Sequence, residues 1–128
     1  MSRIFYPAIF HAEPVGYSVS VPDVRGCFSE GDTLDEAYDN IMESLGLYLE
    51  DTKEYPKASI PQSILHGKDE FIMLLEFDPL VYKRKHDNRS IKKTLTIPAW
   101  LNAAAEEKHI NFSSVLQNAL KQQLDIDE

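Results

Sequence analysis

The last part of the chain combines a short alternating segment with two helix patterns, and this combination limits how the chain can fold. Residues 92–97 alternate polar and apolar side chains and stop at Pro98, which predicts one short β-strand. The following residues predict one helix that runs to about Lys108 and a second helix that begins after Asn111. One strand and two helices bury too little surface to offset the chain entropy that folding removes. This part of the chain therefore needs a partner.

The partner of the predicted strand is either the sheet of the preceding domain or the same strand of a second molecule. A basic stretch before the strand favours the second molecule. Antiparallel pairing of two copies would bring the apolar side chains of both strands into one core and leave the alternate polar side chains on the opposite face. We therefore expect a homodimer. The residues expected to form it are Leu95, Ile97, Phe112 and Leu116.

Charge is distributed unevenly along the chain. The formal net charge is -8, but residues 1–80 hold 15 acidic and 5 basic residues, whereas residues 81–97 hold six basic residues and one acidic residue. An acidic body with a short basic segment favours two partners of opposite charge. The alternative is a solvated surface without such partners.

A two-stranded ribbon with lysine and threonine on its open face fits the major groove of duplex DNA, where these side chains reach base edges. The start of the second helix would offer hydroxyl and backbone N–H groups to flanking phosphates. We expect a dimer, or a tetramer formed on DNA, to bind double-stranded DNA. The pattern leaves open a helix-turn-helix, in which the helix that begins at Phe112 enters the groove instead. The candidate DNA-binding residues are Lys92, Thr94, Thr96, Asn111, Ser113 and Ser114.

The preceding residues predict three strands, a helix and a fourth strand. The first three strands cover residues 3–10, 16–21 and 26–30. Pro7 predicts a bulge or an edge position for the first strand. Residues 70–78 are apolar on both faces, which predicts a central strand.

One helix is predicted between the third and fourth strands. Thr33 and Glu36 form a capping box at its start, before a stripe of apolar residues at helical spacing. Residues 1–78 therefore predict an α+β domain in which one helix covers a small antiparallel or mixed sheet. Residues 79–90 are polar and basic and predict a linker, and residues 91–128 form the domain that needs a partner.

Two segments resemble known families. Residues 92–124 resemble a ribbon-helix-helix DNA-binding domain, although that family often has glycine in the inter-helix turn, where this sequence has His109 and Ile110. The run from Tyr17 to Ala37 has the form Y-x-V-x-x-P-D-x-x-G-C-x-S-x-G-x-T-x-x-E-A and is similar to the signature of HicB-type antitoxins. That resemblance implies a partial ribonuclease-H-like domain that binds and masks a small basic HicA-type toxin, which cleaves mRNA. It also implies a tail that binds operator DNA and represses its own operon.

The predicted helix carries acidic residues at i, i+4 spacing, namely Asp35, Asp39 and Glu43. Like charges at this spacing destabilise a helix by roughly a few tenths of a kcal/mol per pair, and a basic partner would relieve the repulsion. A toxin that holds RNA must be basic, so an acidic inhibitor can occupy the same surface. The alternative is an acidic helix that only faces solvent. The candidate toxin-binding residues are Phe28, Glu30, Asp39 and Glu43.

Two alternative functions are a metal-dependent nuclease, raised by the ribonuclease-H likeness, and a ribbon-helix-helix repressor whose front domain senses a ligand. Two-metal chemistry needs converging carboxylates, one of them on the central strand, and residues 3–10 contain none. Cys27 and the four histidines show neither a nucleophile–base arrangement nor metal-ligand spacing. We therefore expect no enzymatic activity, no catalytic or metal-binding residue, and no cofactor.

The sequence also predicts where the protein works. With a single cysteine no intrachain disulfide forms, and the first ten residues lack a signal-peptide pattern. No apolar stretch reaches the roughly 20 residues of a membrane span. We expect a cytoplasmic protein with no membrane partner.

Overall fold

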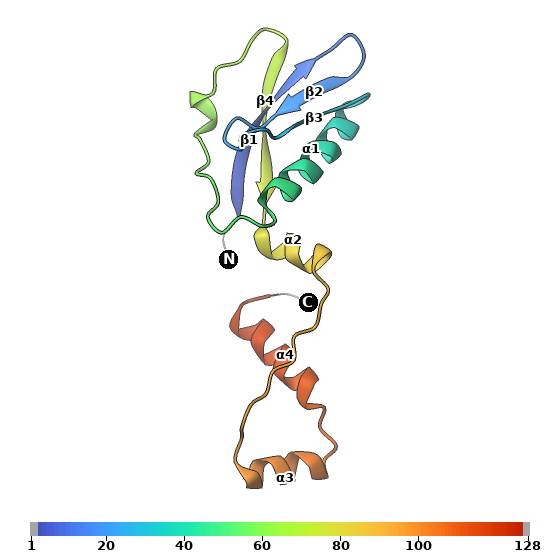
Figure 1. The fold of residues 1–128 in the computed structure, drawn as a ribbon, viewed down its shortest axis with the longest axis vertical. Coiled ribbons are helices and arrows are strands. Elements are labelled where there is room, and N and C mark those ends of the chain that lie inside the picture. The colour runs from blue at the N-terminus through green and yellow to red at the C-terminus, as the bar shows by residue number, and fades with distance from the viewer. Residues whose placement is uncertain (1–2, 127–128) are drawn as a thin grey trace. The chain divides into compact units, whose positions relative to one another are not determined.

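The computed structural model describes residues 3–126. The chain divides into two units, Met1–Arg89 and Ser90–Glu128, and each is described by itself (Figure 1). The elements of the first unit are β1 (Ile4–Ala12), β2 (Tyr17–Ser20), β3 (Phe28–Gly31), α1 (Leu34–Leu49), the 3-10 helix η1 (Pro61–Ser63), β4 (Glu70–Phe77) and α2 (Pro79–His86). The elements of the second unit are α3 (Ala99–Glu107) and α4 (Phe112–Gln123).

The sheet is antiparallel throughout, with the strand order β3-β2-β1-β4. The expected α+β architecture is confirmed, but β4 lies at an edge, so its predicted central place is wrong. Strand β1 lies between β2 and β4 in the order but pairs with β4 alone at Pro7, in agreement with the edge position predicted there. Apolar residues on both faces of β4 do not determine which strands lie beside it, and Leu74 on its outer face is 45% exposed. Pro7 is accommodated because β2 pairs only with Ile9–Ala12, so that at Pro7 the strand β1 has a neighbouring strand on one side alone.

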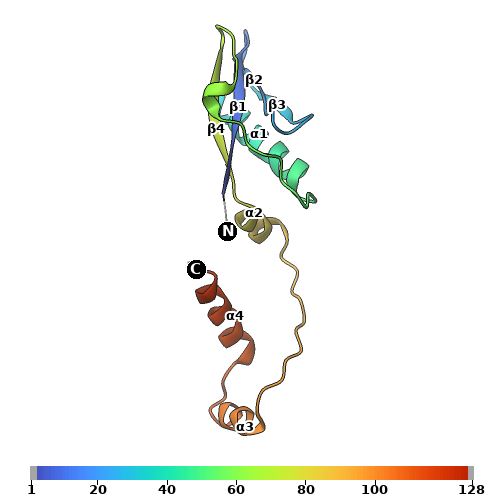
Figure 2. The ribbon, with the colours of Figure 1, turned by 90° about the vertical axis from the view of Figure 1, so that its left-hand side faces the viewer.

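Helix α1 covers one face of the sheet (Figure 2). The predicted cap is confirmed: the Thr33 hydroxyl accepts the backbone N–H of Glu36 at 3.2 Å, and the Glu36 carboxylate accepts the backbone N–H of Asp32 at 2.9 Å. One stripe of α1 meets every second side chain of the strands and forms a buried core. The main core residues are Ala37, Ile41, Leu45 and Leu49 from α1 and Tyr6, Ala8, Phe10, Val19, Leu75 and Phe77 from the strands.

Residues 79–86 form helix α2, so the prediction of a linker that starts at residue 79 is wrong for this stretch. The Asp78 carboxylate caps the helix by accepting the backbone N–H groups of Leu80 and Val81 at 3.0 and 3.4 Å. Pro79 lies in the first turn, where its missing N–H is not needed. The basic residues of the last turn, which suggested a linker, lie where cations stabilise the helix dipole.

Tyr82 holds α2 against the core. Its ring centroid lies 5.8 Å from that of Phe77, and its hydroxyl donates to the Glu50 carboxylate at 2.8 Å. Gly46 of α1 is buried beneath the Tyr82 ring, and a Cβ atom at position 46 would overlap that ring. Glycine inside a helix is about 1 kcal/mol less favourable than alanine. Position 46 therefore has glycine because the docking of α2 requires the space.

In the second unit, α3 and α4 are joined by a tight turn. The backbone N–H of Ile110 donates to the Ala105 carbonyl at 3.1 Å, and that of His109 donates to the Glu106 carbonyl at 3.0 Å, which is a Schellman motif. His109 has a φ of 55°, the left-handed conformation for which glycine is preferred. Histidine thus occupies the position where the resemblance to ribbon-helix-helix domains suggested glycine.

No residue from 90 to 126 is buried. Residues 91–97 belong to no strand, because a strand needs a hydrogen-bonded neighbour and the one sheet of the described residues consists of β1 to β4. Pairing of this segment with a second copy is therefore still a prediction.

Exchanging Gly46 for alanine tests the contact that holds α2. We expect Gly46→Ala to destabilise the wild-type chain by about 1–3 kcal/mol, because the added methyl group overlaps the Tyr82 ring. In a Tyr82→Ala background the same change should stabilise the chain by about 1 kcal/mol, since only helix propensity is left. Urea unfolding of the four proteins measures both effects. An equal effect of Gly46→Ala in the two backgrounds would contradict the role assigned to Tyr82.

Exchanging His109 for glycine tests the inter-helix turn. A residue with a side chain is destabilised by roughly 1–2 kcal/mol in the left-handed conformation. Glycine avoids this strain, but its more flexible unfolded chain offsets part of the gain in stability. We expect His109→Gly to stabilise the second unit by about 1 kcal/mol, whereas His109→Ala should not. The chain has a single tryptophan, Trp100 in α3, so its fluorescence follows the unfolding of this unit. Identical unfolding curves for the glycine and alanine variants would show that the backbone at position 109 is not strained by a side chain.

Candidate functional site

The predicted base-contacting residues lie on an exposed, extended segment that precedes α3 (Figure 2). Lys92, Thr94 and Thr96 alternate there with apolar residues, of which Leu95 and Ile97 are 61% and 47% exposed. Successive side chains of an extended chain point to opposite sides. Paired as a strand, the segment would place the polar set and the apolar set on different faces, as a ribbon that binds DNA on one face would require.

The start of α4 has part of its polar groups engaged within the helix. The Asn111 side-chain oxygen accepts the backbone N–H of Ser114 at 3.0 Å, which confirms Asn111 as the N-cap. The Ser113 hydroxyl accepts from the Gln117 side-chain amide at 2.9 Å. The Ser114 N–H is thus already bound in this conformation, whereas Asn111, Ser113 and Ser114 are all exposed.

Helix α4 presents an apolar face that is largely exposed, with Leu116 half-buried. Phe112 and Leu116, two of the predicted dimer residues, lie four positions apart and so share this face. Phe112 is 44% exposed, and Leu120 and Leu124 on the same side are 51% and 63% exposed.

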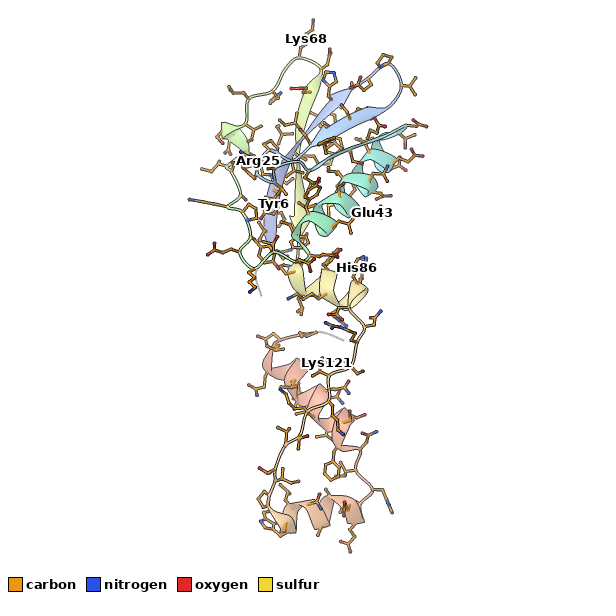
Figure 3. All side chains as sticks on the ribbon, in the orientation of Figure 1. Tyr6, Arg25, Glu43, Lys68, His86 and Lys121 are labelled. Atoms are coloured by element: carbon orange, nitrogen blue, oxygen red, sulfur yellow. The ribbon has the colours of Figure 1, made fainter. Side chains whose placement is uncertain are left out.

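The four predicted toxin-binding residues lie on two different surfaces of the first unit. The strand register places Phe28 and Glu30 on the sheet face opposite α1. Asp39 and Glu43 lie on the exposed side of α1, where Figure 3 labels Glu43. The structure therefore does not bring the four residues into one site.

The sheet face opposite α1 forms a shallow polar hollow of about 610 Å³ that includes Phe28 and Glu30. His11 lies 3.4 Å from the Glu70 carboxylate and 3.8 Å from that of Glu13. The carboxylates beside the hollow are thus close to a histidine, a proximity that sequence spacing did not predict.

A groove that the sequence did not predict lies between α1, β4 and α2. Its volume is about 590 Å³, and we call it the α1–β4–α2 groove. It was missed because α2 was predicted to be a linker; the capping pair Asp78 and Pro79 was the signal that could have found it. The groove is lined by the apolar and aromatic residues Tyr38, Met42, Leu47, Phe77, Val81 and Tyr82 and by the ionisable residues Glu43, Glu76, Asp78, Lys85 and His86.

Acidic groups line the α1 and β4 sides of this groove, and basic groups line its α2 side. Burial, the hydrogen bond to Glu50 and the negative charges of Glu50, Asp51 and Glu43 together raise the pKa of Tyr82 to about 12. Glu76 is paired with Arg3 at 3.2 Å. Glu43 forms no ion pair with another residue of the described part of the chain, so its charge is open to a partner.

The residues weighed for catalysis do not converge. Within residues 3–126 no group of three or more histidine, cysteine, aspartate or glutamate side chains is placed to hold a metal ion. Cys27 is 2% exposed and lies in the core, and burial raises the pKa of its thiol to about 11. Between residues 3 and 126 no helix has the length and apolar character needed to cross a bilayer.

Comparison with known sequences gives matches over most of the chain. A family model described as "HicB_like antitoxin of bacterial toxin-antitoxin system" matches residues 6–120. An uncharacterized 14.9 kDa protein encoded in the rep-hol intergenic region of Haemophilus phage HP1 is 35% identical over 105 residues, which are 77% of this chain and 76% of that protein. A UPF0150 protein of Synechocystis is 49% identical over 35 residues, which are 27% of this chain and 44% of that protein.

Comparison with solved structures gives the same fold. A chain of a toxin-antitoxin complex from Streptococcus pneumoniae is 26% identical, with a TM-score of 0.54 over 95% of this chain and 99% of that one. The antitoxin HicB of Burkholderia pseudomallei is 21% identical, with a TM-score of 0.51 over 95% and 97% of the two chains. Antitoxin HicB3 is 20% identical, with a TM-score of 0.52 over 98% and 100%.

The state of Cys27 can be measured directly. The thiolate is the reactive form, and both its burial and its pKa of about 11 keep the Cys27 thiol protonated and shielded at pH 7.5. We expect a thiol reagent such as 5,5′-dithiobis(2-nitrobenzoic acid) to modify the native chain at least about 100-fold more slowly than the urea-unfolded chain. Equal rates in the two states would show that Cys27 is an accessible thiol and would reopen the question of a nucleophile.

Proposed function

The chain belongs to the HicB-like antitoxin family of bacterial toxin–antitoxin systems, and on this premise we propose that it is an antitoxin with two separate binding functions. The first unit binds and masks a small basic HicA-type toxin that cleaves mRNA. The second unit forms a ribbon-helix-helix dimer that binds operator DNA and represses the operon encoding both proteins.

The toxin-binding half is supported by the likeness to a chain of the S. pneumoniae toxin-antitoxin complex, whose name states that it contains both partners. It is also supported by charge. Residues 1–80 hold 15 acidic and 5 basic residues, and the acidic side of α1 is exposed. A ribonuclease that binds RNA must present positive charge, so an acidic surface attracts it and speeds association.

The observation that carries the DNA-binding half is the lack of any buried side chain in residues 90–126. A chain segment that exposes the apolar face of α4 gains little from folding alone. Pairing two copies of residues 91–97 as antiparallel strands would bury Leu95 and Ile97 together with the apolar faces of both α4 helices. Two such dimers could form a tetramer on adjacent DNA sites.

In this arrangement the ribbon carries Lys92, Thr94 and Thr96 on its open face, where they contact base edges in the major groove. The exposed Ser113 and Ser114 hydroxyls contact the flanking phosphates, and Asn111 orients them as the helix cap. Lys93 lies on the opposite parity of the segment and does not face the bases.

The division of labour is tested by replacing Lys92, Thr94 and Thr96 together with alanine. We expect this triple variant to lose the specific gel shift of the DNA upstream of its gene, because the base contacts are removed, while neutralising the toxin as well as the wild type does. Lys93→Ala is the matched control: it also removes one positive charge from the same segment and should still give the specific shift.

Two outcomes would contradict the proposal. One is a specific DNA shift that survives in the triple variant. The other is the loss of DNA binding and of toxin neutralisation together, in a variant whose circular dichroism shows that it is folded.

A further inference from the structure

We propose that the α1–β4–α2 groove is the place where the first unit receives the toxin, and that its occupant is an apolar side chain flanked by lysine or arginine. This proposal rests on the proposed antitoxin function and makes it specific. It assigns toxin binding to Asp39 and Glu43 on α1 rather than to Phe28 and Glu30 on the opposite face of the sheet.

The groove has an apolar floor with exposed apolar walls. Phe77 is buried at the floor, and Tyr38 and Met42 are half-buried beside it. Leu47 of α1 and Val81 of α2 remain 59% and 49% exposed. Large aliphatic side chains on two elements that line one groove mark a surface that a partner covers, since isolated exposed leucines are ordinary and a contiguous apolar set is not.

The charges on the α1 side of the groove favour a cationic partner. Glu43 lies at its edge without an ion pair in the described part of the chain, and Asp39 precedes it by one helical turn. Asp78 is engaged as the cap of α2 and Glu76 is paired with Arg3, so neither carboxylate is as available as Glu43. The cationic and titratable side chains that line the groove are Lys85 and His86, both on α2, where Figure 3 labels His86.

The raised pKa of Tyr82, which lines the groove, also reflects the nearby carboxylates. Its pKa of about 12 arises first from burial and then from Glu50, Asp51 and Glu43. A lysine or arginine of the toxin would lie in the field of these carboxylates, while the apolar side chain between such cations would cover Leu47 and Val81. Apolar contact surrounded by complementary charge is the usual composition of a specific protein interface.

The hollow on the other face of the sheet suits this occupant less well. Its floor includes Ser18, Ser20 and His11, and Phe28 is its one largely exposed apolar side chain within the described residues. Glu70 in the hollow lies 3.4 Å from His11, and Glu13 beside it accepts the Ser18 hydroxyl at 2.9 Å, whereas Glu30 is exposed and forms no ion pair with another described residue. The hollow therefore differs from the groove mainly in its more polar floor, since each has one carboxylate without an ion pair in the described part of the chain.

The test compares matched substitutions on the two faces of the full chain. Leu47 and Phe28 are both exposed, so Leu47→Glu and Phe28→Glu each place the same carboxylate at a solvent-facing apolar position. Isothermal titration calorimetry with the co-encoded toxin, made catalytically inactive, measures the dissociation constants. We expect Leu47→Glu to weaken binding at least about tenfold, equal to about 1.4 kcal/mol, and Phe28→Glu to change it less than about twofold.

A charge pair of variants provides an independent readout. Glu43→Lys should weaken toxin binding and reduce its dependence on salt, because an attractive charge becomes a repulsive one. Glu30→Lys, the same change on the other face, should leave both quantities near the wild-type values. Circular dichroism of the four variants verifies that each is folded.

The results separate failure of the groove from failure of the antitoxin function. Binding by the wild type together with unchanged binding by Leu47→Glu and Glu43→Lys would overturn the groove as the toxin site and leave the antitoxin function standing. A larger loss in Phe28→Glu than in Leu47→Glu would move the site to the open face of the sheet. No binding of the toxin by the wild-type chain would overturn both proposals.

Discussion

The second unit has a helix whose apolar face the described residues leave largely exposed. No residue from 90 to 126 is buried, and Leu95, Phe112 and Leu120 are between 44% and 61% exposed. Water disfavours such a surface by roughly 25 cal/mol for each Å² of apolar area. The chain can remove this surface from water by pairing with a second copy. The need to bury this apolar surface explains why the alternating segment, the amphipathic α4 and the proposed binding of DNA all depend on dimerisation.

The first unit buries a hydrophobic core within itself, and its candidate binding surfaces consist of the side chains that remain exposed outside that core. Helix α1 packs one apolar stripe against the sheet and exposes an acidic side to solvent. Tyr82, which lies over Gly46, holds α2 beside α1. The docking of α2 creates the α1–β4–α2 groove. The same small domain can therefore present an acidic, partly apolar surface to a basic partner while a short basic segment leads to the second unit.

Local signals in the sequence were sufficient for much of the fold. Side chains that bond their own backbone leave a clear pattern, so the caps at Thr33 and Asn111 were predicted and are confirmed. Strand order was not predictable in this way, because apolar residues on both faces of β4 say nothing about which strands lie beside it. Helix α2 was missed because its basic last turn outweighed the capping signal of Asp78. The toxin-binding candidates fell on two surfaces because spacing along the chain does not state which face of a sheet a helix covers. Pairing of residues 91–97 involves a second molecule, so one chain does not display it.

The most direct measurement of the central claim is the mass of the full chain in solution. One chain has a mass of 14.6 kDa. Sedimentation equilibrium should give twice this mass for the wild type, and the single-chain mass after Leu95 and Ile97 are both changed to aspartate, because the paired strands then lose their shared core. A wild-type chain that stays at 14.6 kDa at concentrations where it binds DNA, or a double variant that stays dimeric, would contradict completion of the second unit by a second copy.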